Sequence, residues 1–380
     1  MESLWKLTYL LEPASLALVA TAVSVAYASA SRALDHGKEM ERNLGFSESS
    51  ITLDRSQALM IPLASSCSLL LMFYLFASVS HLVAAFAAAA AATALFFCLS
   101  PCLPRARSLL RLPDPFLPSS SSRLFCCSSS KPFTRLQGLL LLFCVGTVAA
   151  WLVTGHWVLN NALGIAICVA FVSHVRLPNI KICALLLACL FVYDVFWVFF
   201  SERFFGANVM VSVATQKASN PVHTVADKLS LPGLQMITKK IELPVKLVFP
   251  RDLLGGIVPG STPGDYMMLG LGDMAIPGML LALVLSFDHR KSKEAVAPSD
   301  SSPSPKRRKY VWYALTGYGV GLVTALAAGI LSQSAQPALL YLVPSTLGPV
   351  MYLSWLRNDL WELWEGSGEI LNEKAHLLEV

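Results

Sequence analysis

Two aspartates stand inside long apolar runs of this sequence, and they are the residues with the clearest capacity for chemistry. Asp194 lies within the run at 182–200, and Asp273 lies within the run at 266–287. An aspartate at the centre of a membrane helix costs about 2.5 kcal/mol or more on insertion scales, so such residues are rare and usually face a polar interior. A functional role for both carboxylates is therefore the first hypothesis.

Two carboxylates brought together in a medium of low dielectric constant cannot both ionise, so they share one proton. The ionised partner can then take a proton from a water molecule as it attacks a peptide carbonyl. The protonated partner donates to the developing oxyanion and later to the leaving amine. This is the chemistry of an aspartic peptidase, and it needs no metal ion, no other cofactor and no covalent intermediate.

The elements that position this pair must be membrane helices. Of the 380 residues, 55% are hydrophobic and 14% are charged, against about 25% charged residues in an average soluble domain. Nine runs approach the ~20 residues that cross a bilayer as a helix, at 13–30, 58–79, 82–100, 136–153, 157–173, 182–200, 266–287, 310–331 and 337–356. We expect an all-α polytopic membrane protein with one membrane domain over 1–380, divided into an N-terminal five-helix part (13–173) and a catalytic four-helix part (180–356).

The distribution of basic residues predicts the orientation of these helices. With the N-terminus outside, the predicted cytosolic segments hold 21 of the 29 Lys and Arg residues, and short cytosolic loops are the ones that accumulate such residues. We therefore predict a luminal or extracellular N-terminus and a cytosolic C-terminus. The alternative for the first run is a signal peptide cleaved after Ala28-Ser29-Ala30, but cleavage would invert every later helix and put the basic loops on the wrong side.

This orientation brings the two aspartates to one depth in the bilayer. Asp194 lies six residues before the outer end of its run, and Asp273 lies seven residues after the start of its run. At the rise of a helix these separations correspond to about 9 and 10 Å. The two carboxyl groups can therefore meet at one level.

Two hydrophilic stretches, at 101–135 and 288–309, are rich in Ser, Pro and basic residues. We expect both to be disordered cytosolic loops. They serve as anchors of the topology or, at 288–309, as a patch that holds anionic lipid. Cys126 and Cys127 in the first loop are either acylated thiols or plain small apolar residues.

Small residues and prolines surround the acidic pair. Gly270 and Gly272 leave space beside Asp273 for a backbone to approach, and Pro277 loosens the same helix. The same glycines are also typical of simple contacts between membrane helices. Pro337 begins the ninth run at its outer end, on the face of the aspartates, where a proline also commonly starts a helix.

The motifs that these residues form resemble those of a known clan. Tyr193-Asp194, Gly270-Leu271-Gly272-Asp273 and Pro337-Ala338-Leu339 are similar to the YD, GxGD and PAL motifs of the signal peptide peptidases and presenilins. The flanking sequences YDVFWVFF, NVMVSVAT, KLVFPRDLL and MLGLGDMAIPGMLLAL resemble the signal peptide peptidase branch, over about residues 180–355. The short stretch before the first run is most similar to the signal peptide peptidase-like members without a large luminal N-terminal domain.

The resemblance implies a nine-span fold in which Asp194 and Asp273 are catalytic. It further implies that the flanking motif residues bind substrate and shape the site, namely Tyr193, Gly270, Leu271, Gly272, Pro337, Ala338 and Leu339. We therefore expect an aspartic-type intramembrane endopeptidase without a cofactor. Its expected substrates are single-span proteins with a cytosolic N-terminus, or signal peptides.

The expected partners are the lipid bilayer and the transmembrane helices of substrates, with no nucleic acid, and self-association into a homo-oligomer is left open. Two alternatives remain. Paired intramembrane carboxylates also serve proton- or cation-coupled transporters, and a pseudoprotease could hold membrane proteins without cleaving them. The C-terminal His376–Val380 carries no endoplasmic reticulum retrieval signal, which favours an endosome or the Golgi.

The segment Ile241–Phe249, ahead of the seventh run, is short, β-branched and nearly alternating, with Pro244 suited to an edge position. A substrate helix must unwind before cleavage, and an exposed strand edge could pair with the unwound chain. This segment is therefore predicted to offer such an edge. An interfacial loop resting on the bilayer is the alternative.

Overall fold

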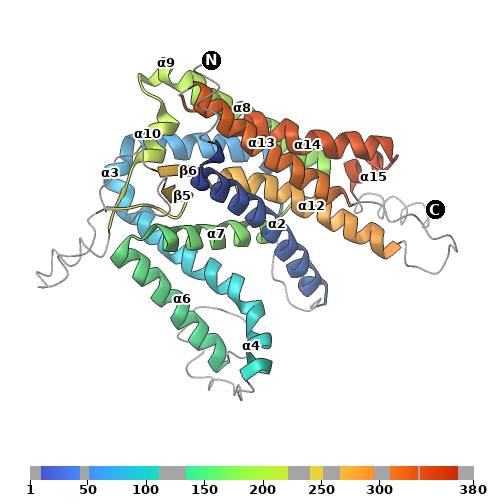
Figure 1. The fold of residues 1–380 in the computed structure, drawn as a ribbon, viewed down its shortest axis with the longest axis horizontal. Helices are drawn as coiled ribbons and strands as arrows, with labels where there is room; N and C mark the ends of the chain where they lie inside the picture. Colours follow the sequence, from blue (N-terminus) through green and yellow to red (C-terminus); the bar gives the residue numbers. More distant parts are fainter. Residues whose placement is uncertain are drawn as a thin grey trace, which may run out of the picture. The chain divides into compact units, whose positions relative to one another are not determined.

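The computed structural model describes residues 10–42, 51–110, 134–220, 240–250, 266–294, 309–332 and 334–366, and they are mostly helical (Figure 1). The helices are α2 (Pro13–Arg42), α3 (Arg55–Leu99), η2 (Ser100–Cys102), α4 (Leu103–Leu110), α6 (Arg135–Thr154), α7 (Trp157–His174), α8 (Ile180–Val195), η3 (Phe196–Phe200), α9 (Ser201–Phe205), α10 (Val209–Thr215), α12 (Gly272–Glu294), α13 (Tyr310–Ser332), α14 (Ala338–Leu356) and α15 (Leu360–Glu365). The strands are β1 (Ile51–Thr52), β2 (Val175–Arg176), β3 (Ala218–Ser219), β4 (Lys240–Ile241), β5 (Lys246–Pro250) and β6 (Tyr266–Gly270).

Eight stretches of these helices are long and apolar enough to cross a membrane, within the part of the chain that the structure describes. They correspond to every predicted run except 266–287. The run at 157–173 forms helix α7 although it carries Asn160 and Asn161 near its start. Many large apolar side chains on these helices are exposed, such as Phe86 and Leu142, as expected for surfaces that face lipid. A multi-pass membrane protein is confirmed.

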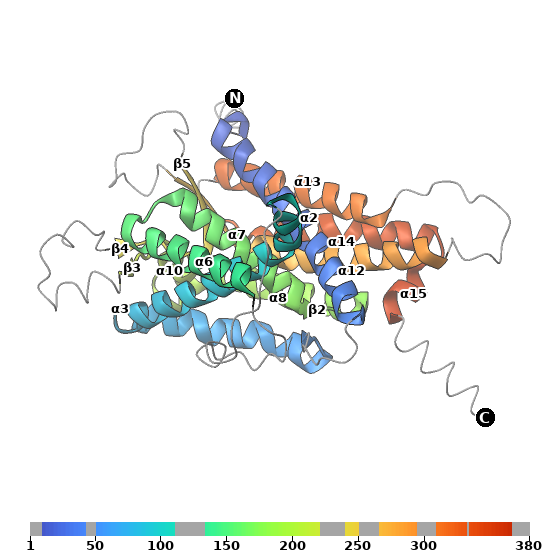
Figure 2. The same ribbon diagram turned by 90° about the horizontal axis from the view of Figure 1, so that it is seen from below.

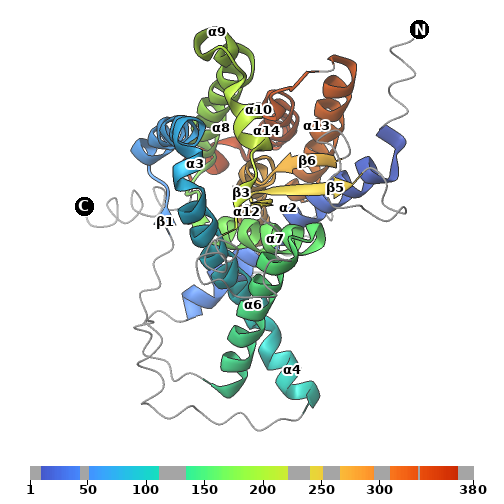
Figure 3. The same ribbon diagram turned by 90° about the vertical axis from the view of Figure 1, so that its left-hand side faces the viewer.

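The predicted helix at 266–287 begins later than expected. Residues Tyr266–Gly270 form strand β6, which pairs with β5, and helix α12 starts at Gly272 (Figure 3). Met267 and Met268 are as compatible with a strand as with a helix, so the periodicity of this short apolar run could not distinguish the two. Asp273 therefore lies in the first helical turn, and its depth cannot be counted at the rise of a helix.

The predicted runs at 58–79 and 82–100 belong to one hydrogen-bonded helix, α3, rather than to two separate helices. No glycine or proline lies between the two runs, so nothing in the backbone chemistry ends the helix there. The two candidate spans within α3 are Arg55–Phe76 and Ser78–Cys102.

Both predicted disordered loops begin with helix. Helix α4 occupies Leu103–Leu110, and α12 continues through the polar residues up to Glu294. The prediction of disorder is wrong for these two parts. The remaining residues, 111–133 with Cys126 and Cys127, and 295–308, lie outside the described residues.

The segment Ile241–Phe249 does contain strands, β4 and β5, but its predicted exposed edge is wrong. All five residues of β5 are buried, and the strand is already paired with β6. Within it, Leu247 and Val248 are 0% and 4% exposed. The alternating pattern identified a strand correctly, but it could not distinguish a solvated face from a face covered by the rest of the chain.

The chain forms two compact units, which we describe separately. The first comprises residues 1–77, 171–216 and 247–380, and the second comprises residues 78–170 and 217–246. The predicted division into a five-helix and a four-helix part of one membrane domain stays a prediction.

In the first unit α13 packs along α14, α12 packs along α2 and against α13, and α14 packs against α8 (Figure 2). Glycine permits the closest of these approaches. A Cβ atom at Gly317 would collide with the backbone of Ser345, and one at Gly321 would collide with the Ser345 hydroxyl and lie 3.2 Å from Leu342 Cα. Small residues at such positions let membrane helices come close.

We expect Gly321→Val to destabilise the protein by about 1–3 kcal/mol, because the added side chain overpacks the contact between α13 and α14. Gly329→Val is the matched control on the same helix, since nothing lies within 4 Å of a Cβ atom there. Chemical denaturation of both variants in detergent micelles measures the difference. Equal stability of the two variants would contradict the close α13–α14 contact.

A polar network joins the ends of α12, α13 and α15. Asp288 is buried, and its carboxylate accepts hydrogen bonds from the N–H groups of Tyr310 and Val311 at 3.0 and 2.9 Å. It therefore caps the first turn of α13 from a different helix. The Tyr310 hydroxyl donates to Asp359 at 2.6 Å, and Lys291 forms an ion pair with Glu362 at 2.6 Å.

In the second unit two asparagine side chains hold irregular segments against helices. Asn160 donates to the Lys246 carbonyl at 3.1 Å, and Asn220 donates to the Leu152 carbonyl at 2.6 Å. Strands β3 and β4 pair antiparallel in the same unit. The side chain of Asn160, near the start of α7, therefore has a structural role in this unit.

Candidate active site

Asp194 lies in the last turn of α8 and is 3% exposed. Asn179 starts this helix by accepting a hydrogen bond from the Ile182 N–H at 3.0 Å. The Asp194 Oδ2 atom accepts a hydrogen bond of 2.9 Å from the N–H of Leu339, in the first turn of α14. The PAL motif therefore reaches the acidic motif through its backbone, and it leaves one carboxylate oxygen of Asp194 free of that contact.

A π-helical turn, Phe196–Phe200, follows Asp194 directly. Such wide turns are rare and often occur at functional sites. This one is held by polar side chains, since Asn208 donates to the Val198 carbonyl at 3.0 Å and Trp197 donates through Nε1 to the Ser66 hydroxyl at 3.1 Å. The NVMVSVAT sequence thus supports the segment next to the acidic residue.

Asp273 lies in the first turn of α12 and is partly exposed. Its backbone carbonyl accepts a hydrogen bond of 3.1 Å from the hydroxyl of Tyr318, which is fully buried on α13. Its side chain is close enough to Asp194 for a direct electrostatic interaction between the two carboxyl groups. The pair that the sequence predicted is therefore brought together within the first compact unit.

The two glycines of the GxGD motif have different surroundings. A Cβ atom at Gly270 would lie 3.3 Å from Asp273 Oδ2, so the missing side chain leaves room for the carboxylate itself. Gly272 is exposed, and nothing lies within 4 Å of its missing Cβ atom. Between them, the Leu271 carbonyl accepts the N–H of Ala275 at 2.8 Å and begins the helix.

In the PAL motif, Pro337 is buried and precedes the first residue of α14, Ala338. Its φ of −68° and ψ of 112° give the extended conformation that comes before a helix. The side chain of Leu339 is also buried. This geometry directs the Leu339 N–H away from its own helix, where the first N–H groups have no intrahelical partner.

Tyr193 lines a shallow groove of about 530 Å³. The other lining residues come from α3, and they are Ile61, Ala64, Ser65, Ser68, Leu69 and Met72. Small and polar residues make up half of that helix face. The residue that precedes Asp194 therefore lines a groove open to the surface of the first unit.

Sequence reasoning missed Tyr318, Asn208 and Ser66 as residues that hold the site in place. A tyrosine or serine inside an apolar run has many uses, so no local signal identified Tyr318 or Ser66. Asn208 was visible only as part of a similar flanking sequence. Among the described residues, no group of three His, Cys, Asp or Glu side chains is arranged to hold a metal ion.

Comparison with known proteins gives a consistent result. The profile of the signal peptide peptidase family matches residues 46–369. The chain is 83% identical to signal peptide peptidase-like 1 of Oryza sativa subsp. japonica and 68% identical to signal peptide peptidase-like 1 of Arabidopsis thaliana, in both cases over the full length of both chains. It is 33% identical to signal peptide peptidase-like 2B of Homo sapiens, over 78% of this chain and 44% of that protein.

The two aspartates in a helical membrane protein were compatible with both an aspartic protease and a coupled transporter. The family match favours the protease. With its two acidic motifs on helices that pack together and with a family profile that covers most of its length, this chain belongs to the signal peptide peptidase family of intramembrane aspartyl proteases.

Proposed function

We propose that Asp194 and Asp273 are the catalytic residues, and that they cleave peptide bonds within transmembrane segments of substrate proteins. The observation that carries this assignment is that α8 and α12, which pack together, each carry one buried or half-buried aspartate, and that the Leu339 N–H donates to Asp194 at 2.9 Å. Covalent labelling by a photoreactive aspartyl transition-state analogue tests it. Labelling of the wild type but of neither alanine variant is expected, and undiminished labelling of both variants would exclude the assignment.

The geometry favours a division of roles between the two carboxyls. The Leu339 N–H stabilises negative charge on Asp194 Oδ2, because a hydrogen bond to the charged form favours that form. Asp194 is thus suited to accept the proton of the attacking water. Asp273, which is partly exposed, is suited to donate to the carbonyl oxygen and then to the leaving amine.

The flanking residues have supporting roles in this proposal. Gly270 leaves room for the Asp273 carboxylate, and the open space at Gly272 admits a substrate backbone. Leu271 begins α12, while Pro337 and Ala338 set the position of the Leu339 N–H. Tyr193 lines the groove along α3, which is suited to an apolar helix with small side chains.

We further propose nine spans, in which α12 is the seventh along the chain and adds to the eight stretches described above, and an N-terminus outside the cytosol. The apolar stretch of α12 between Asp273 and Asp288 is shorter than a full crossing, so β6 completes the passage. The orientation predicts that Lys38, Arg176 and Arg290 all lie on the cytosolic side of the membrane. In support of this, the segments that carry them line one cavity in the first unit.

This orientation leads to the proposal that substrates are single-span proteins with a cytosolic N-terminus, or signal peptides. A pair of substrates with the same transmembrane sequence inserted in opposite directions tests it. We expect cleavage of the N-in form at least about tenfold faster, since only one direction presents the scissile carbonyl correctly to a fixed acid–base pair. Equal cleavage of the two forms, after matching their insertion, would contradict the orientation.

We also propose an endosomal or Golgi location. Whether the chain associates into a homo-oligomer is left open. Imaging of the tagged chain against organelle markers tests the first. The mass of the purified protein in detergent, corrected for bound detergent, tests the second.

A further inference from the structure

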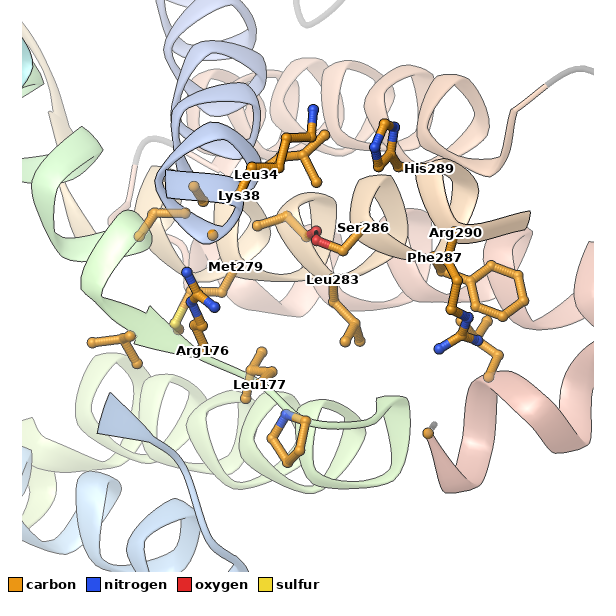
Figure 4. Close-up of a pocket in the computed structure, with 18 of the residues that line it drawn as sticks. Leu34, Lys38, Arg176, Leu177, Met279, Leu283, Ser286, Phe287, His289 and Arg290 are labelled. Atoms are coloured by element: carbon orange, nitrogen blue, oxygen red, sulfur yellow. Dashed lines mark hydrogen bonds between the residues drawn. The ribbon is translucent and has the colours of Figure 1, made fainter. Parts of the chain in front are cut away.

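A cavity in the first compact unit lies away from the acidic pair and gathers basic side chains (Figure 4). Its volume is about 460 Å³. Four segments far apart in the sequence line it: the end of α2, the end of α7 with β2 and the residues after it, the second half of α12, and α15 with the residue that follows. The basic residues in its lining are Lys38, Arg176, His289, Arg290 and Lys293.

The charge in this cavity is not balanced. Glu362 is the acidic residue in the lining, and it already forms ion pairs with Arg290 at 2.9 Å and with Lys291 at 2.6 Å. Lys38 lies 3.5 Å from Asp35, whose side chain is 63% exposed. On the same helix, Glu39 lies within ion-pair distance of Arg32 and of His36, at 3.4 and 3.9 Å.

Arg176 and His289 have unmet bonding capacity. Within the described part of the chain no carboxylate lies within ion-pair distance of Arg176, and its guanidinium has only a contact of 3.7 Å with the Met40 sulfur. The His289 Nε2 atom is buried without a hydrogen-bond partner among the described residues. Desolvation by burial and the nearby Lys38 and Lys293 lower the pKa of His289.

The structure holds Arg176 in place rather than leaving it as a loose surface cation. Its backbone belongs to β2, which pairs parallel with β1, and its carbonyl accepts the Leu53 N–H at 3.0 Å. A Cβ atom at Gly37 would lie 3.0 Å from Arg176 Nη2, so the glycine on α2 leaves room for the guanidinium. An arginine fixed in this way is pre-organised for a planar or tetrahedral oxyanion.

Apolar side chains form the rest of the cavity. Leu34, Leu177, Leu283 and Phe287 line it beside the basic residues (Figure 4). A small, strongly hydrated anion would gain nothing from these walls. A ligand with a phosphate at one end and a glycerol or acyl part at the other would use both kinds of lining.

We propose that this cavity is a binding site for the phosphate-bearing headgroup of an anionic membrane lipid. Lys38, Arg176 and His289 bind the phosphate, and Leu34, Leu177 and Leu283 contact the adjoining glycerol and the start of an acyl chain. Basic pockets between membrane helices on the cytosolic side are suited to such headgroups. The bound lipid would join α2, β2, α12 and α15 at the end of α12 remote from Asp273.

Binding to the purified full-length protein in neutral detergent tests this proposal. Native mass spectrometry would count bound molecules, and thermal unfolding would follow stabilisation, with three probes: short-chain phosphatidylinositol 4-phosphate, phosphatidylcholine, and inositol 1,4-bisphosphate with inorganic phosphate. We expect the anionic lipid to bind and to raise the melting temperature, and the zwitterionic lipid to do neither. If the soluble phosphates bind as tightly as the lipid, the cavity is a phosphate-binding site but the assignment to a lipid is wrong.

The pocket variant Lys38→Gln, Arg176→Gln, His289→Gln should weaken lipid binding at least about tenfold. The matched control Arg42→Gln, Arg55→Gln, Lys181→Gln removes three basic residues outside the cavity and should bind as the wild type does. Arg176→Gln alone is a milder variant if the triple one unfolds. Equal loss in the pocket and control variants, or no binding of any anionic probe to the wild type, would overturn the proposal.

Discussion

Alanine at Asp194 or at Asp273 is expected to abolish proteolysis, with a loss of at least about 10³-fold, while expression and membrane insertion stay nearly unchanged. Each carboxyl has a separate proton to move, so neither can replace the other. Removing a buried acid relieves its desolvation instead of disrupting packing. Asp→Glu at either position should also be severely damaging, because an added methylene displaces the carboxyl beyond the tolerance of a positioned pair.

The measurement is the rate of cleavage of a single-span substrate in detergent, normalised to the amount of folded enzyme. Asp35→Ala is a suitable control, because that side chain is 63% exposed on α2, where it lies 3.5 Å from Lys38. It should leave the rate within about twofold of the wild type, as surface changes generally do. Cleavage that persists in either Asp194→Ala or Asp273→Ala would exclude the pair as the catalytic residues.

Proline at Leu339 is expected to reduce the rate of cleavage by about 10- to 100-fold. It removes the N–H that donates to Asp194 Oδ2, and a hydrogen bond to a charged group contributes about 1.5–3 kcal/mol. Position 339 lies in the first turn of α14, where a helix tolerates proline because its N–H has no intrahelical partner. The helix itself should therefore persist.

Leu339→Ala is the matched control, because it shortens the buried side chain but keeps the N–H. A loss confined to the proline variant, with unchanged substrate KM, identifies the backbone donor as the active part of the motif. If the alanine variant loses as much activity as the proline variant, packing of the leucine side chain explains the motif and the hydrogen bond does not.

The membrane helices and the acidic pair could be read from the sequence for a simple physical reason. Charged groups are expelled from apolar helices, so Asp194 and Asp273 stood out against nine runs that contained no other charge. The apolar run at 157–173 was predicted correctly despite its asparagines, since Asn160 has a carbonyl partner in the fold. The length and hydropathy of a segment depend on that segment alone, so they can be predicted without knowing the rest of the fold.

The rest of the site depends on contacts between distant segments. Nothing near Tyr318 indicates that its hydroxyl reaches the carbonyl of Asp273, 45 positions away. Likewise, the motif at Pro337 was expected to shape the site, but the sequence could not say that the N–H of Leu339 donates to Asp194. The sequence did not predict strand β6, because its pairing with β5, a separate segment, leaves no mark in the local pattern of residues.

The basic cavity also depends on contacts between segments that are distant in the sequence. Its basic residues come from α2, β2 and α12, and the sequence explained them as markers of the cytosolic side. Only the fold shows that Arg176 and His289 face one space, and that Gly37 makes room for the guanidinium.

The most direct test of the central claim is to locate the bond that the purified protein cleaves. The enzyme and a single-span substrate would be reconstituted together in lipid vesicles, and the product termini identified by mass spectrometry with and without an aspartyl transition-state analogue. We predict new termini inside the transmembrane segment, absent with the analogue and absent with Asp273→Ala. Termini confined to residues outside the segment, or products that form equally with the analogue, would contradict intramembrane cleavage by this acidic pair.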